Sequence, residues 1–137
     1  MIERVHEHII SELGQNTRTD TVFVLVAILL NLLTLGINSG VAAGGERTST
    51  TWIVFFTFMV LVIIVNFVVE IGLIKGRQTR TKLINGLLKM YQDQGVAGYY
   101  DPSLLSNYTT RYNLFMMAVI ATGLIAMIVP LVLIISP

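Results

Sequence analysis

Three long apolar runs decide what this sequence can fold into. They cover residues 21–43, 52–75 and 113–135. Each is about 23 residues long, enough for an α-helix rising 1.5 Å per residue to cross roughly 30 Å of hydrocarbon. The chain is 54% hydrophobic and only 12% charged, against about 25% charged in a soluble domain, so a soluble core could not bury its apolar surface. We therefore predict an all-α integral membrane protein, a single domain over residues 1–137 with three transmembrane helices.

The first residues have the spacing of a short amphipathic helix. Apolar residues recur at helical intervals from Ile2 to Leu13, and Gly14 follows as a typical helix end. We predict an amphipathic N-terminal helix over residues 1–14, which lies on the inner leaflet or on a partner. The first span would then begin separately, with Asp20 as its N-cap.

The polar segment 77–112 carries a second amphipathic pattern. The second span either continues into it or breaks near Gly76, and Asp101-Pro102 has the order typical of a new helix start. We predict an amphipathic cytoplasmic helix within this connector between spans two and three. Its basic residues are candidate contacts for anionic lipid: Arg77, Arg80, Lys82 and Lys89.

Lysine and arginine are distributed unevenly around the spans. Only Arg47 lies between spans one and two, and none follows span three. The other eight precede span one or lie between spans two and three: Arg4, Arg18, Lys75, Arg77, Arg80, Lys82, Lys89 and Arg111. The positive-inside rule predicts a multi-pass membrane protein with its N-terminus in the cytoplasm and its C-terminus outside.

The first span carries two kinds of residue on nearly opposite faces. At 100° per residue, one face is polar and the other is a glycine stripe: Asn31, Thr34 and Asn38 against Gly36, Gly40 and Gly44. Glycines four apart let another helix approach closely. The neighbour is either the third span or another chain. With both faces covered, the first span should be the least lipid-exposed of the three.

The polar stripe needs hydrogen-bond partners, because an unsatisfied amide in hydrocarbon is costly. Asn31 lies ten residues into the first span, and Asn66 lies nine residues in from Lys75. Both are therefore about 13.5–15 Å deep. Glu70 lies one turn from Asn66 on the same face. We predict a polar intramembrane cluster of Asn31, Thr34, Asn38, Asn66 and Glu70.

Glu70 is the one ionisable residue well inside a span, which makes it a functional-site hypothesis. It would carry protons or coordinate a cation. The alternative is that it stays protonated, or reaches toward Arg77 or Arg111 at the inner boundary.

The sequence excludes several classes of function. It has no cysteine, no histidine in a span, no paired carboxylates and no phosphate-binding loop, so we expect no enzyme, no cofactor and no metal site. A net charge of +1 gives no sign of a nucleic-acid partner. The expected partners are the lipid bilayer, a bound lipid, and other membrane subunits or copies of the chain itself.

Two functions compete. The favoured one is an accessory or scaffold subunit of a larger integral membrane complex, which packs through both faces of the first span. The alternative is a homo-oligomeric ion channel or small transporter with a polar path lined by spans one and two.

Overall fold

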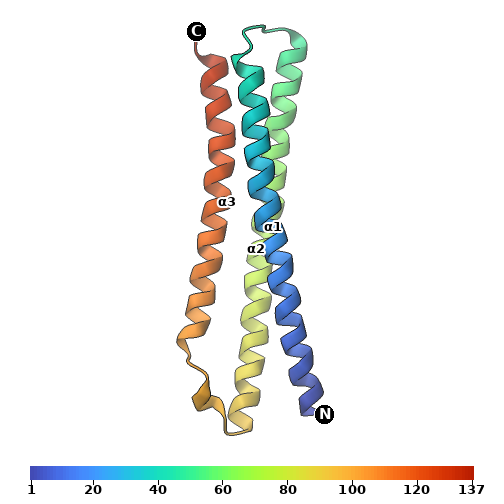
Figure 1. Cartoon of the computed structure of the whole chain (residues 1–137), viewed down its shortest axis with the longest axis vertical. Helices are drawn as coiled ribbons and strands as arrows, with labels where there is room; N and C mark the ends of the chain where they lie inside the picture. The colour runs from blue at the N-terminus through green and yellow to red at the C-terminus, as the bar shows by residue number, and fades with distance from the viewer.

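Three long helices that run up, down and up make the whole fold (Figure 1). The computed structural model describes all residues, 1–137. The helices are α1 (Ile2–Ala43), α2 (Ser49–Asp93) and α3 (Ser103–Ile135), and a single 3₁₀ turn, η1 (Ala97–Tyr99), lies between α2 and α3. Each long helix packs against the other two. The N-terminus and the α2–α3 connection lie at one end of the bundle, and the α1–α2 hairpin and the C-terminus at the other.

All three helices contain a stretch long and apolar enough to cross a membrane, so the predicted all-helical architecture with three such helices is confirmed. Their middle sections present large apolar side chains outward: Leu29, Leu33 and Phe67 are 59%, 61% and 67% exposed. A soluble protein rarely shows so continuous an apolar surface. This surface is typical of a multi-pass membrane protein.

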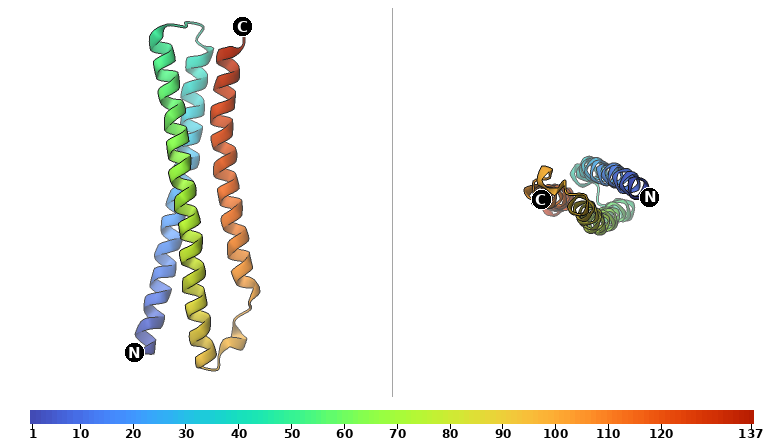
Figure 2. Two further views of the ribbon diagram at one scale, coloured as in Figure 1. Left: turned by 180° about the vertical axis from the view of Figure 1, so that it is seen from behind. Right: turned by 90° about the horizontal axis from the view of Figure 1, so that it is seen from below.

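The helices α1 and α2 are longer than a membrane requires. With 42 and 45 residues, they measure about 63 and 67 Å, roughly twice the thickness of the hydrocarbon core. The excess lies at the end that holds the N-terminus. There α1 leans away from α3 and stays beside α2 (Figure 2). The bundle therefore continues beyond the apolar sections as a helical extension.

The N-terminal segment is not a separate helix, in contrast to the sequence-based expectation. The helix α1 continues through Gly14, and Asp20 lies inside it rather than capping a new helix. An internal glycine costs only about 1 kcal/mol, and packing on α2 offsets this. Nε2 of His6 lies 3.2 Å from Oη of Tyr91, and a Cβ built on Gly86 would lie 3.8 Å from Cδ1 of Ile9.

In the connector 77–112, the structure follows the first of the two alternatives, in which the second span continues as a helix. Its first part is the end of α2, which passes Gly76 without a break. Its last part is the first turns of α3, where the Asp101 carboxylate accepts a 2.9 Å hydrogen bond from the Ser103 backbone N–H. That bond holds the pKa of Asp101 below its usual value. The helix start predicted at Asp101-Pro102 therefore lies within one residue of the observed one.

Two apolar clusters make up the core of the bundle. One lies toward the N-terminal end and is centred on Ala27, Leu73 and Val119. The other lies toward the α1–α2 hairpin and contains Phe55 and Ile134. The section of α1 between them holds Asn31, Thr34 and Asn38, all of which are buried. A polar layer thus separates two apolar ones.

The continuity of α1 can be tested at Gly14. No atom lies within 4 Å of a Cβ added there, so Gly14→Ala should raise the free energy of unfolding by about 0.5–1 kcal/mol, because alanine has the better helix propensity and loses less backbone entropy on folding. Thermal unfolding followed by circular dichroism in detergent measures this. Gly95→Ala is the matched control and should destabilise, since Gly95 has φ +72°. A destabilising Gly14→Ala would show that a helix ends at Gly14 after all.

Candidate functional site

The polar stripe of α1 faces the interior of the bundle. Asn31, Thr34 and Asn38 are only 1%, 2% and 0% exposed. They lie on the same side of α1 as the buried Ala27 and Ala42. Every predicted polar position of the first span is thus enclosed by α2 and α3.

Asn31 and Asn66 form a reciprocal amide pair near the middle of the bundle. Nδ2 of Asn31 donates to Oδ1 of Asn66 at 3.0 Å, and Nδ2 of Asn66 donates to Oδ1 of Asn31 at 2.7 Å. Nδ2 of Asn66 also donates to the Val62 carbonyl at 2.7 Å. Each amide therefore satisfies the other, as a group surrounded by apolar side chains requires.

The third helix, α3, also contacts this pair of asparagines. Nδ2 of Asn31 also donates to Oγ1 of Thr122 at 3.0 Å and approaches the Val119 carbonyl at 3.4 Å. A Cβ built on Gly123 would lie 2.6 Å from Oδ1 of Asn66, so glycine is what leaves room for the amide. We call Asn31, Asn66, Thr122 and Gly123 the central polar layer. Sequence reasoning missed Thr122 and Gly123, although Thr122 lies nine residues in from Asn113 and so at the depth of Asn66.

Asn38 makes a second, simpler contact toward the α1–α2 hairpin. Its Nδ2 donates to the Phe55 carbonyl at 3.2 Å, which joins α1 to α2. Its Oδ1 and the neighbouring Ser39 hydroxyl are buried without a hydrogen-bond partner. Asn38 and Asn31 therefore act at separate levels of the bundle rather than in one connected network.

Glu70 stands apart from the central polar layer. Its side chain is partly exposed, and its Oε1 is buried without a hydrogen-bond partner. It makes no hydrogen bond to Asn31 or Asn66, whose amides are occupied by each other and by backbone and hydroxyl groups. The predicted cluster thus contains the two asparagines together but not the carboxyl group.

The glycine face of α1 is uncovered. Gly36 and Gly40 are exposed, and a Cβ added at either would meet no atom within 4 Å. At Gly44 the nearest atoms are carbonyl oxygens of the same helix, at 3.5 and 3.6 Å. The third span therefore does not pack on this stripe, and within one chain α1 is no more buried than α2 or α3. The expectation that both faces of the first span are covered, and that it is the least exposed of the three, is therefore not met within one chain.

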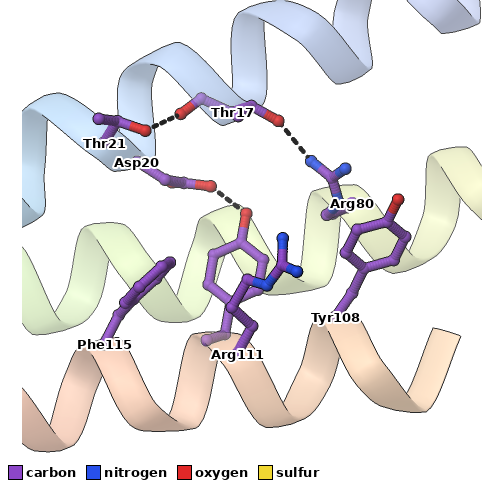
Figure 3. A pocket seen from close by; sticks show the side chains of 8 residues that line it. Thr17, Asp20, Thr21, Arg80, Tyr108, Arg111 and Phe115 are labelled. Atoms are coloured by element: carbon purple, nitrogen blue, oxygen red, sulfur yellow. Dashed lines mark hydrogen bonds between the residues drawn. The ribbon is translucent and has the colours of Figure 1, made fainter. Parts of the chain in front are cut away.

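A second polar layer joins the helices where the apolar runs end. The Tyr112 hydroxyl donates to Oδ2 of Asp20, and it lies 2.9 Å from Oδ1 of Asn16, whose Nδ2 donates to the Gly76 carbonyl at 3.2 Å. In Figure 3 this bond is the dashed line that starts at the labelled Asp20. Burial raises the pKa of Asp20 despite this bond and nearby Arg80. A side chain on Gly76 would collide with the Asp20 carboxylate.

The predicted lipid-contacting residues do not act as one group. Nη1 of Arg77 donates to Oδ1 of Asn113 at 2.7 Å. Nη1 of Arg80 donates to Oγ1 of Thr17 at 2.7 Å. Lys82 and Lys89 are exposed on the outside of the helical extension. Arg77 thus connects α2 to α3 and Arg80 connects α2 to α1, whereas neither lysine makes a hydrogen bond to another helix.

Gly123 gives a direct test of the central polar layer. Gly123→Ala should lower the free energy of unfolding by about 1–3 kcal/mol, because the new methyl group collides with an amide held by three hydrogen bonds. Gly36→Ala adds the same methyl group to open space and should not destabilise. Thermal unfolding of both variants in one detergent is the measurement. Equal stability of the two would contradict the close packing at Gly123.

No known family model matches this chain, and neither a similar characterised protein nor a similar solved structure was found.

Proposed function

We propose that this protein is an accessory or scaffold subunit of a larger integral membrane complex, with no catalytic role of its own. Its contribution is a rigid three-helix body that offers the glycine face of α1 to a neighbouring chain. The observation that carries the proposal is that this face is bare while the opposite face of the same helix is fully packed.

The internal use of the polar groups supports a subunit over a channel. A channel needs side chains that converge on a water-filled path. Here the amides of Asn31 and Asn66 bond each other, and the Asn38 amide bonds a backbone carbonyl. These contacts favour a structural role, in which the amides hold one helix against another. In the alternative, a homo-oligomeric channel or small transporter, the same residues would have to leave these partners and face a common axis.

The glycine face supports contact with another chain. Lipid gives no hydrophobic drive between helices, so close packing is a main source of their association. A bare glycine surface against acyl chains forgoes those packing contacts. Toward the hairpin the face continues into an open hollow of about 420 Å³ that Gly40, Gly44 and Val54 help to line. A helix of a neighbouring subunit would fill this surface.

Charge supports an orientation with the N-terminus and the helical extension in the cytoplasm. Eight of the nine lysines and arginines lie toward the end that holds the N-terminus and the α2–α3 connection (Figure 1). Arg47 is alone at the other end, where its Nη2 donates to the Ser136 carbonyl at 3.2 Å. Cytoplasmic segments near membrane spans are enriched in basic residues.

Single cysteines test this orientation, because the natural chain has none. Cysteines at Glu46 and Ser136 should react with a membrane-impermeant maleimide added to intact cells, and one at Gln92 should not. All three positions are exposed in the bundle, so protection of the last would come from the membrane. Labelling at Gln92 alone would reverse the orientation.

Gly40→Ile tests the assembly. No atom lies within 4 Å of a Cβ added at Gly40, so the monomer should keep its stability, while the mass of the species extracted in mild detergent should fall toward the 15.2 kDa of one chain. Light scattering or native mass spectrometry measures this. Ala121→Ile, at an exposed position of α3, is the matched control and should leave the mass unchanged.

The composition of the wild-type species decides between the two functions. Unlike subunits that co-purify with the chain, and are lost with Gly40→Ile, support the accessory role. An assembly of identical chains would favour the channel instead. A wild-type protein that is monomeric both in mild detergent and in nanodiscs would contradict the proposal.

A further inference from the structure

A cavity whose lining residues are mostly polar or charged opens between α1 and α3 where the apolar runs end (Figure 3). Its volume is about 210 Å³. This is less than the 300–1,000 Å³ of a pocket for a drug-sized molecule, and suits one compact group. The residues that matter to its chemistry are Thr17, Asp20, Arg80, Tyr108, Arg111 and Phe115.

Arg80 is fixed in this cavity by its neighbours. Its guanidinium lies over the Tyr108 ring, 4.2 Å from the ring centroid, and its Nη1 donates to Thr17 at 2.7 Å. Its Nε is buried without a hydrogen-bond partner. A guanidinium has five N–H donors in a rigid fork, and the bond to Thr17 uses only one of those of Arg80. An ordered arginine of this kind matches the geometry of phosphate oxygens.

Arg111 supplies a second positive charge from the other side. It lies on α3, and Figure 3 shows its guanidinium directed into the space between α3 and α1, as that of Arg80 is from α2. Asp20 is the one acidic residue of the lining, and its carboxylate accepts a hydrogen bond from Tyr112. Two arginines against one aspartate leave a net charge of at least +1. The complementary ligand is an anion.

The position of the cavity identifies the kind of anion. Phe115 lies two residues inside the third apolar run, and Arg80 lies five residues, or about 7.5 Å, beyond the end of the second. This is the level of lipid headgroups. Phe115 is 40% exposed, and Leu25, one helical turn along α1 from the lining residue Thr21, is also exposed. A ligand with its charge in the cavity would thus have apolar surface beside it for hydrocarbon chains.

We propose that this cavity binds the phosphate of an anionic phospholipid, with Arg80 as the fixed anchor and Arg111 as the second contact. The site goes beyond the proposed role as a subunit and does not depend on it. It also replaces the basic stripe expected from the sequence, because Lys82 and Lys89 lie outside the cavity and Arg111 lies within it. A soluble phosphate compound shares the chemistry but not the adjoining apolar surface.

Native mass spectrometry with defined lipids tests the site. The purified protein in mild detergent is titrated with phosphatidylglycerol or with phosphatidylcholine, and bound lipids are counted. We expect phosphatidylglycerol to bind more tightly, and Arg80→Gln and Arg111→Gln each to weaken it by about fivefold, or roughly 1 kcal/mol. Lys82→Gln removes the same charge from an exposed site of the extension and should change little.

Three outcomes would overturn the proposal. Equal loss in Lys82→Gln and in the arginine variants would show general attraction to a basic surface. Equal binding of phosphatidylcholine would show that no anionic headgroup is selected. Displacement of the lipid by millimolar inorganic phosphate, together with stabilisation by phosphate alone, would assign the cavity to a soluble anion. Arg111 is exposed, so Arg111→Gln keeps the test open even where Arg80→Gln fails to fold.

Discussion

The reciprocal hydrogen bonds between Asn31 and Asn66 set the register of the bundle. Apolar side chains on either side of them gain little from one particular helix register, because lipid is as apolar as a leucine surface. The amide pair, in contrast, favours one register of the helices over the others. A slip of one helical turn, about 5.4 Å, would separate the two amides and leave each without a partner in an apolar surrounding. Thr122 and Gly123 bring α3 to the same level, since one accepts a hydrogen bond from Asn31 and the other leaves room for Asn66.

The packing of one face of α1 against α2 and α3 fixes the direction in which its opposite face points. Because the side chains from Asp20 to Ala42 on one side are buried against α2 and α3, the helix cannot rotate to hide its glycines without breaking the amide pair. Gly36 and Gly40 are therefore held outward in a fixed orientation. That rigidity supports the proposed role as a subunit, since a preformed surface loses little conformational freedom when a neighbouring helix packs on it.

The sequence predicts the parts of the fold that follow from local chemistry. Long apolar runs define three helices, and counting residues from the polar boundaries places Asn31 and Asn66 at one depth. It does not predict features that depend on a neighbouring helix. Gly14 and Asp20 are typical helix boundaries, yet packing on α2 and the Tyr112 hydroxyl keep both inside α1. Likewise Arg111 becomes part of a cavity only because α3 brings it opposite Arg80.

The most direct test of this account is a double-mutant cycle on the amide pair, measured as the free energy of reversible unfolding in detergent or bicelles. Asn31→Leu and Asn66→Leu should each destabilise, and the double variant should lose less than the sum of the two. We expect a coupling of about 0.6–1.7 kcal/mol, the range found for hydrogen bonds between membrane helices. Thr57→Val, which removes a hydroxyl bonded only within α2, should show no coupling with Asn31→Leu. Additive effects of Asn31→Leu and Asn66→Leu would contradict the claim that this pair sets the register of the helices.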